Sequence, residues 1–287
     1  MQTVLKSRQS STLIPTQEAL VILGSGYVAR FMPSLHRFYT KILYTSRDPD
    51  HHLAWVPQNR RIRFDLAQPE TWTNVPSRAD LLWCFPAAPL KAVEDFGRAA
   101  GLFQTYGRLL VLGSTSAYDA GLSAEHPPPW LDETAPVDFS KPRVQGEEFL
   151  RKECAATLLR IAGIYGPGRN PYQWIRSGRV SLSEKYVNLI HVEDLAEICL
   201  AALRYGVPGA VYNVSDGIPR TWREIGRQLD ANAGAHREAP DANQQSGKRI
   251  NTAKLRLLLQ QAGISIRHPD LFLSLERLDD EKPGIHP

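Results

Sequence analysis

Long apolar segments are missing from this sequence of 287 residues. No uninterrupted run approaches the roughly 18 apolar residues that a helix needs to cross a bilayer, so we expect no transmembrane segment. The opening residues, MQTVLKSRQSSTLIPTQEA, also lack the apolar stretch of about 7 to 15 residues that marks a secretory signal. We therefore expect a cytoplasmic chain with no membrane partner.

Cysteine is scarce as well. The three cysteines, Cys84, Cys154 and Cys199, form no CxxC pair and no ligand spacing with histidine. This excludes a small fold held by disulfides. Each cysteine lies in an apolar or amphipathic stretch, which is typical of buried free thiols in a reducing compartment.

Clusters of basic residues are also absent. Lys and Arg number 34 against 30 Asp and Glu, and the basic residues occur singly or in pairs such as Arg60-Arg61 and Lys248-Arg249. Nucleic-acid sites usually carry longer basic runs, so we expect no nucleic-acid partner. The 43% hydrophobic and 22% charged residues are typical of a folded globular chain, long enough for one large domain or two modest ones.

The first recognisable element is a short apolar run, ALVIL at residues 19–23. It has no polar alternation, which predicts a strand buried on both faces of a parallel sheet. Glycines follow at once. Residues 27–39 then carry apolar side chains at helical spacing, and Pro33 should kink that helix or loosen one turn.

The same alternation continues along the chain. Further strands are expected at residues 41–45, 61–64, 81–85, 109–113 and 156–161, with helices at residues 91–106 and 143–153. Strands that alternate with helices predict βαβ units. The expected fold class is therefore α/β, a Rossmann-like doubly wound parallel sheet.

Beyond Gly163 the pattern changes to a loop rich in Gly, Pro and Tyr, followed by more helices. Thr221 and Glu224 have the spacing of a capping box, and a helix over residues 251–261 would stop at Gly263. We expect a Rossmann domain at residues 18–168 and a smaller C-terminal lobe at residues 169–287. The two are interleaved, with about residues 189–215 returning to the first domain.

A GxGxxA motif, GSGYVA, stands between the first strand and the first helix. The first glycine permits a tight turn, the second lets the backbone approach a pyrophosphate, and the small final residue lets the helix pack on the strand. This context favours dinucleotide binding over a plain turn. The expected cofactor-binding residues here are Gly24, Ser25, Gly26, Tyr27 and Val28.

The end of the second strand indicates which dinucleotide is bound. An acid about 20 residues after the glycines would accept hydrogen bonds from the NAD ribose, whereas Arg suits the 2′-phosphate of NADP. Ser46 and Arg47 occupy this place and favour NADP, although Asp48 follows directly and leaves NAD open. Asp65 and Leu66 follow the third strand, where they would meet the adenine or form a plain turn.

Six motifs occur in an order that resembles the extended short-chain dehydrogenase/reductases, the NAD-dependent epimerase/dehydratase family. They are GSGYVA, Asp65-Leu66, GSTSAYD (113–119), RIAGIYGPG (160–168), NLIHVEDLA (188–196) and VYNVSDG (211–217). The chain resembles an atypical branch of this family. The resemblance implies a cofactor in the N-terminal domain, a substrate in the cleft that is often a nucleotide sugar in relatives, and a Ser, Tyr, Lys catalytic set.

The catalytic set is incomplete. Ser114, four residues before Tyr118, is similar to the family's serine. The YxxxK pair fails, because taking Arg143 as the lysine places Phe139 in the tyrosine position. Taking Lys141 as the lysine places Val137 there instead, so neither alignment supplies a phenol. A phenylalanine cannot move a proton.

Other side chains would have to replace the tyrosine. The candidate acids and bases are Tyr118, Asp138, Lys141, Tyr165 and His191, each with a structural role as the alternative. The expected catalytic residues are Ser114, Tyr118 and Arg143, and the last of these would also hold the nicotinamide ribose. His191 and Asp194 lack a third ligand for a metal, and in relatives the similar HVxD segment fixes the helix to the substrate lobe.

Two functions follow as hypotheses. The first is an NADP-dependent oxidoreductase or epimerase-like enzyme that acts on a polar, phosphorylated or nucleotide-linked small molecule. The second is a non-catalytic NADP-binding redox sensor or scaffold that has lost the proton-transfer tyrosine. A homodimer is left open in both.

Overall fold

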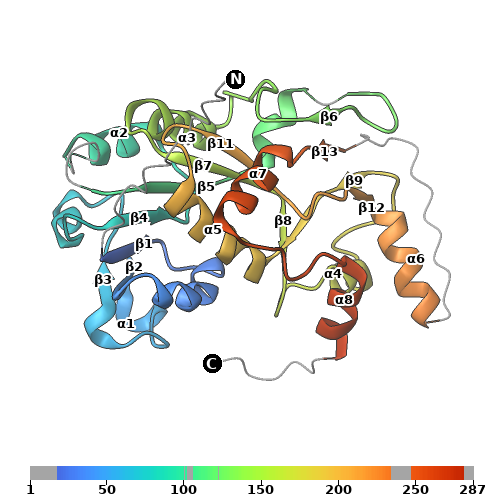
Figure 1. Ribbon diagram of the computed structural model, residues 1–287, viewed down its shortest axis with the longest axis horizontal. Coiled ribbons are helices and arrows are strands. Elements are labelled where there is room, and N and C mark those ends of the chain that lie inside the picture. Colours follow the sequence, from blue (N-terminus) through green and yellow to red (C-terminus); the bar gives the residue numbers. More distant parts are fainter. Residues whose placement is uncertain (1–17, 100, 102–105, 122, 234–246, 281–287) are drawn as a thin grey trace, which may run out of the picture.

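The computed structural model describes residues 18–99, 101, 106–121, 123–233 and 247–280. Its centre is a seven-stranded parallel sheet in the order β11-β7-β5-β4-β1-β2-β3 (Figure 1). The strands are β1 (Ala19–Leu23), β2 (Lys41–Ser46), β3 (Arg61–Arg63), β4 (Asp80–Trp83), β5 (Leu109–Ser114), β7 (Thr157–Ile161) and β11 (Val211–Val214). The doubly wound α/β fold class predicted from the sequence is therefore confirmed.

The chain changes direction at the middle of this sheet. It runs from β1 outward to β3, returns, and then runs from β4 outward to β11, so β1 and β4 lie side by side. In open α/β sheets, ligands bind in the crevice beyond the carboxyl ends of two such strands. The glycines after β1 stand at this crevice.

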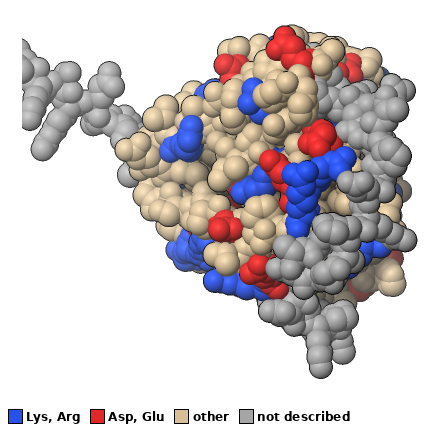
Figure 2. Space-filling view, turned by 90° about the vertical axis from the view of Figure 1, so that its right-hand side faces the viewer, with Lys and Arg blue, Asp and Glu red and all other residues tan. Residues whose placement is uncertain are grey.

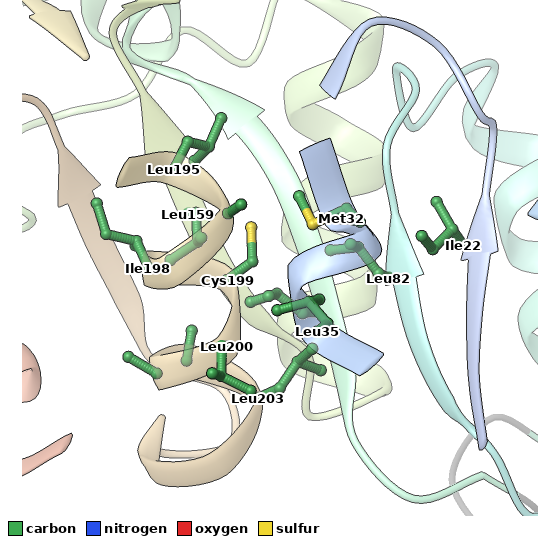
Figure 3. Close-up of a cluster of buried hydrophobic side chains, with 14 of the residues drawn as sticks. Ile22, Met32, Leu35, Leu82, Leu159, Leu195, Ile198, Cys199, Leu200 and Leu203 are labelled. Atoms are coloured by element: carbon green, nitrogen blue, oxygen red, sulfur yellow. The ribbon is translucent and has the colours of Figure 1, made fainter. Parts of the chain in front are cut away.

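Helices cover both faces of the sheet. One face carries η1 (Val28–Arg37), α5 (Val192–Tyr205) and α7 (Ala253–Ala262), and the other carries α2 (Leu90–Ala99) and α3 (Pro142–Glu153). Figure 3 shows Cys199 and Leu203 of α5 directed toward Met32 and Leu35 of η1. These apolar layers explain the buried, non-alternating strands.

The first helix differs from its prediction. Residues 27–39 were expected to form an α-helix, but the structure has a 3₁₀-helix at Val28–Arg37 with Pro33 inside it. Proline donates no backbone N–H, and its ring clashes with the carbonyl four residues earlier, so the regular α-helical ladder cannot run through it. The face toward the core is kept, with Ala29, Met32 and Leu35 buried.

Two other helix predictions change in extent or number. The helix predicted over residues 91–106 ends at Ala99; residues 100 and 102–105 lie outside the described part. Among the helices that were not predicted is α8 (Leu271–Asp280). The thiols of Cys84, Cys154 and Cys199 are free, as expected.

The smaller lobe has a separate apolar core. It contains α4 (Pro171–Arg176), α6 (Trp222–Ala233) and α8, with Tyr165, Tyr172 and Ile225 buried among them. The capping box of α6 is confirmed, because the Glu224 carboxylate accepts from the Thr221 N–H at 2.6 Å and the Thr221 hydroxyl accepts from the Glu224 N–H at 3.1 Å. Gly263 ends α7 with φ +66°, as predicted.

The remaining elements are short strands outside the central sheet and short helices. The strands pair in twos: β8 (Gly163–Tyr165) with β10 (Leu189–His191), β9 (Tyr186–Val187) with β12 (Arg220–Thr221), and β6 (Trp130–Leu131) with β13 (Arg249–Ile250). The remaining helices are α1 (Pro49–His52), η2 (Gln58–Arg60), η3 (Pro69–Asn74) and η4 (Thr115–Gly121).

Charged side chains of both signs are mixed on the surface. On the face shown in Figure 2, Lys and Arg side chains lie beside Asp and Glu side chains, without a large patch of one sign among the coloured residues. Among the described residues, the helices are all too short or too polar to span a bilayer.

Candidate functional site

The loop after β1 is shaped by its two glycines. Gly24 has φ +83°, a backbone conformation that residues with a side chain rarely adopt. A Cβ on Gly24 would also lie 2.6 Å from Cδ1 of Phe85, which is too close. Thr45 holds the loop, since its hydroxyl accepts from the Gly24 N–H at 2.9 Å and its carbonyl accepts from the Ser25 N–H at 3.0 Å. The loop geometry is therefore fixed by the neighbouring strand.

Gly26 differs from Gly24 because it faces open space. A Cβ at Gly26 would find no heavy atom within 4 Å among the described residues. The Ser25 hydroxyl oxygen, also in this loop, is buried without a hydrogen-bond partner in the described chain. An open backbone and an unpaired hydroxyl at the switch point suit the pyrophosphate of a dinucleotide.

Tyr27 and Val28 occupy the next two positions. The Tyr27 hydroxyl donates to the Pro167 carbonyl at 3.0 Å, and the Arg169 guanidinium lies 4.3 Å from the Tyr27 ring centroid. Burial raises the pKa of Tyr27 to about 12. Val28 begins η1 and packs against the core. Tyr27 thus joins the glycine loop to the loop of residues 166–169.

The end of β2 places Arg47 in solvent. Arg47 is exposed, while the Ser46 hydroxyl lies 2.8 Å from Nδ1 of His52. The carboxylate of Asp48 accepts from the His51 N–H at 3.3 Å and caps α1. Asp48, the acid that could bind the ribose of NAD, is thus hydrogen-bonded to the helix that follows it.

Asp65 and Leu66 form a turn after β3. The Asp65 carboxylate accepts from the Ala67 N–H at 2.9 Å, and the Asp65 N–H donates to the Thr71 hydroxyl at 2.9 Å. Leu66 is buried in the core beside the sheet. The described contacts of these two residues are those of a structural turn.

The loop after β4 completes the crevice, and the sequence analysis did not identify it. Besides the contact of Phe85 with Gly24, a Cβ at Gly146 would lie 1.9 Å from the Ala87 carbonyl oxygen, so helix α3 touches this loop directly. The signal was present in the small and rigid residues FPAAP at positions 85–89.

Ser114 ends β5 and lies beside Arg143. The Ser114 hydroxyl accepts from the Ser116 N–H at 3.2 Å. Arg143 donates to the Ser116 hydroxyl at 2.8 Å and to the Ser114 carbonyl at 3.3 Å. Two of the three predicted catalytic residues are thus brought together, with the guanidinium held by neutral partners and not by a carboxylate.

Two lysines converge on Asp119 next to this pair. Lys141 hydrogen-bonds to one Asp119 oxygen, and Lys248 donates to the other at 2.5 Å. Burial would raise the pKa of Asp119, but the hydrogen bonds and charges of the two lysines outweigh it and lower that pKa. Lys248 also donates to the Thr115 carbonyl at 3.0 Å.

Lys248 directly precedes β13. The Asn188 side chain fixes its segment, because the amide nitrogen donates to the Lys248 carbonyl at 2.8 Å and the amide oxygen accepts from the Ile250 N–H at 3.0 Å. Burial lowers the pKa of Lys248, and Asp119 opposes the shift only in part. Its role could not be found from the sequence, since Lys248 is 129 residues away from Asp119.

The third predicted catalytic residue, Tyr118, lies in the protein interior. It is 0% exposed, its hydroxyl donates to Asn213 at 2.7 Å, and it accepts from Arg160 at 3.0 Å. Arg160 in turn pairs with Glu148 at 2.9 Å. These contacts are those of a structural tyrosine.

Phe139, at the predicted tyrosine position, points elsewhere. Its side chain is 51% exposed, and its ring centroid lies 6.0 Å from the Lys152 ammonium near the end of α3. The Phe139 carbonyl accepts from the Gln145 side chain at 2.8 Å. The position therefore supplies neither a phenol nor an aromatic ring to Ser114.

Behind Gly113 lies a buried carboxyl group, Glu147. A Cβ at Gly113 would be 2.9 Å from the Glu147 carboxyl carbon, so glycine makes room for it. One carboxyl oxygen, Oε2, has no partner among the described residues. Burial raises the pKa of Glu147 to about 7, although Arg143 and Arg160 oppose the shift.

The HVED segment ties the two lobes together. The Asp194 carboxylate accepts from the backbone N–H groups of Arg267 at 2.7 Å and His268 at 3.1 Å. This fixes the start of α5 to the segment before α8. The geometry matches the role that the resemblance implied for HVxD.

His191, Glu193 and His268 place ligand atoms within 4.8 Å of one another, so a metal site has to be considered. The two imidazoles stack at 3.5 Å with an interplanar angle of 25°, so their in-plane lone pairs run side by side and do not converge. The His191 Nδ1 already accepts from the Glu193 N–H at 3.3 Å. Burial lowers the pKa of His191 to about 4. The stacked rings of His191 and His268 join the start of α5 to the segment before α8.

Comparison of sequences gives a partial match. No protein-family profile matches the chain. Over 131 residues the chain is 27% identical to Protein YeeZ of Escherichia coli strain K12, and this match covers 44% of the chain and 45% of YeeZ. The chain thus spans less than half the length of this curated relative.

Solved structures align over nearly the whole chain. A candidate NAD-dependent epimerase/dehydratase from Methylobacillus flagellatus aligns with a TM-score of 0.72 and 22% identity, covering 93% of this chain and 98% of that one. A functionally unknown conserved protein from Silicibacter pomeroyi aligns with a TM-score of 0.69 and 24% identity, covering 93% and 99%.

Two further structures contain a nicotinamide dinucleotide. The Bordetella bronchiseptica enzyme WbmG in complex with NAD has a TM-score of 0.68 and 16% identity, with 97% of each chain covered. RMD from Pseudomonas aeruginosa complexed with NADPH has a TM-score of 0.64 and 18% identity, with 93% and 99% covered. The chain therefore has the fold of the NAD-dependent epimerase/dehydratases, the extended short-chain dehydrogenase/reductases that its motifs resemble.

Proposed function

We propose that this chain is an NADP-binding oxidoreductase of the epimerase/dehydratase type that acts on a polar small molecule. The observation that carries the proposal is the open backbone at Gly26, which faces the crevice at the switch point of the sheet. When bound there, the nicotinamide ring would donate or accept a hydride.

Different residues of the chain would bind the pyrophosphate and the 2′-phosphate of the cofactor. The Gly24 and Gly26 backbone and the Ser25 hydroxyl would hold the pyrophosphate, at the N-terminal end of η1. Arg47 is exposed at the end of β2 and would bind the 2′-phosphate. Because Asp48 caps α1, NADP is favoured over NAD.

The substrate would lie beside Ser114. Its hydroxyl can donate to a substrate oxygen, while the nearby Arg143, Lys141 and Lys248 provide three positive charges against two carboxylates, those of Asp119 and Asp138. This balance favours a substrate with a phosphate or another anionic group. Lys248, with its lowered pKa and partly buried side chain, is the group we propose to hold the exchangeable proton.

The experiment begins with the purified protein. The bound dinucleotide is identified by mass, and NADPH oxidation is then followed with a panel of carbonyl and nucleotide-sugar substrates. Ser114→Ala should lower turnover without lowering NADPH affinity, and the exposed Ser34→Ala is the matched control. Equal turnover in the two variants would refute the role of Ser114.

A second function, an NADP-binding sensor or scaffold, rests on a specific observation. The burial of Tyr118 and the position of the exposed Phe139 ring near Lys152 support a site without the family's phenol. If NADPH binds while none of the substrates is turned over, this second function replaces the first. If neither NADPH nor NADH binds, both are excluded.

A further inference from the structure

A groove of about 470 Å³ lies where three helices end. Arg37, Arg204 and Arg267 line it together with a single acid, Glu197, and with apolar residues from η1, α5 and the segment after α7. The volume falls in the range of about 300 to 1,000 Å³ that is usual for small-molecule sites.

This groove is separate from the dinucleotide crevice. Phe38 comes shortly before the first residue of β2, and Tyr205 comes shortly before the first residue of β11, so the groove lies at the amino edge of the parallel sheet. The glycine loop follows the last residue of β1 and lies at the opposite edge. Figure 3 shows apolar side chains of α5 and η1, two of the helices that end at the groove, directed toward each other.

The three guanidinium groups are in excess of their acidic partners. Arg37 and Arg267 each bond to one oxygen of Glu197, the latter at 3.1 Å, and the Glu197 side chain is 6% exposed. Arg204 lies 4.8 Å from the Phe38 ring centroid, and it has no hydrogen bond or ion pair with any other residue that the structure describes. The formal charge of these four groups is +2.

Helix ends reduce this charge but do not cancel it. The C-termini of η1, α5 and α7 meet at the groove, and each helix C-terminus is equivalent to about −0.5 of a charge. Three such ends amount to about −1.5, which is smaller than the excess. The last carbonyls of α7 are also engaged locally, by the N–H groups of Gly263 and Ile264. The groove therefore keeps a positive potential.

We propose that this groove binds a compact small-molecule polyanion, of the class of a diphosphate or a tricarboxylate. A guanidinium has five N–H donors, and Arg37 and Arg267 each use one on Glu197, so the others can reach an anion in the groove. Arg204 can offer its planar fork to a phosphate or carboxylate. Glu197 keeps its partners in the bound state, which avoids leaving a buried charge unpaired.

The test uses the full chain, once alone and once with saturating NADPH, so that binding at the glycine loop is told apart from binding at the groove. Inorganic pyrophosphate, citrate and an acidic peptide are titrated in separately by calorimetry, and hydrogen exchange of residues 197–205 locates the site. We expect saturable binding of at least one anion, with protection of that segment. Arg204→Gln should weaken the affinity roughly tenfold to a hundredfold, as expected for a charged hydrogen bond worth about 1.5 to 3 kcal/mol.

Arg98→Gln is the matched control, because Arg98 is an exposed arginine on α2 at the other face of the sheet. It should leave the affinity unchanged. Arg204→Lys keeps the charge and should keep part of the affinity, while the thermal midpoint of both Arg204 variants should match that of the wild type.

Three results would overturn the proposal. The first is the absence of saturable binding of either anion. The second is an equal affinity in Arg204→Gln and Arg98→Gln. The third is binding of an acidic peptide alone, which would make the groove a protein-docking surface. Since the site is separate from the crevice, each result is independent of whether the proposed redox function holds.

Discussion

The two glycines of the cofactor loop predict opposite effects of substitution. Gly26→Val places its side chain in open space and in an ordinary backbone conformation, so we expect a change in unfolding free energy within about 0.5 kcal/mol. The same side chain would occupy the space that a pyrophosphate needs. Losing one charged hydrogen bond costs about 1.5 to 3 kcal/mol, so NADPH affinity should fall at least tenfold.

Gly24→Ala is the matched comparison. Its φ of +83° disfavours any side chain, by about 1 to 2 kcal/mol, and the Phe85 ring at 2.6 Å has to move as well. We therefore expect Gly24→Ala to lower stability as well as binding. The two variants therefore distinguish the role of this loop in folding from its role in binding the cofactor.

The assay combines NADPH fluorescence titration with urea denaturation of both variants. The reasoning would be refuted if Gly26→Val bound NADPH as tightly as the wild type. It would also fail if Gly26→Val unfolded more easily than Gly24→Ala, because a side chain at Gly26 would then clash with its surroundings.

The remaining predictions concern four other side chains. Arg47→Ala should erase a preference for NADPH over NADH of roughly tenfold to a hundredfold, measured by paired titrations; equal affinities in the wild type would contradict it. Phe139→Ala should change turnover no more than the loss of an exposed packing contact would. Tyr118→Phe should lower the unfolding free energy by about 1 to 3 kcal/mol, because Asn213 and Arg160 lose a buried partner, and leave NADPH affinity intact. The native pKa of Glu147, raised from 4.5 to about 7, means that the folded state binds more protons than the unfolded state between these values. Wild-type stability should therefore fall as pH rises from about 4.5 to 7, by up to about 3 kcal/mol relative to Glu147→Gln, in urea denaturation series across pH; parallel profiles would exclude a raised pKa of Glu147 in the folded state.

The sequence predicts those parts of the fold whose signals are local. The apolar run of β1 marks a buried strand with its observed bounds, Ala19–Leu23, and the capping box and Gly263 mark helix ends through bonds between near neighbours. The 3₁₀ form of η1 was missed although Pro33 was visible. Pro33 indicates a disturbed helix, but the packing of Met32 and Leu35 against α5 decides how the chain accommodates it.

The residues of the candidate site also fall into those that the sequence reveals and those that it does not. Gly24, Gly26 and Arg47 are recognisable because they follow strands directly in the chain. Lys248 beside Asp119 is not recognisable, because the contact crosses 129 residues and depends on how the lobes interleave. The environment of Tyr118 was not recognisable for a related reason: its motif is local, but the buried partners of its hydroxyl, Arg160 and Asn213, lie on other strands.

The interleaved path of the chain determines when the site exists. A ribosome that has released residues up to 233 has produced every recognisable motif, from the glycine loop to VYNVSDG. It has not yet produced Lys248, which holds Asp119 and the Thr115 carbonyl in place. Contacts this distant in sequence form late, since closing a long loop precedes any gain from them. The substrate side is therefore assembled only when the last part of the chain folds back.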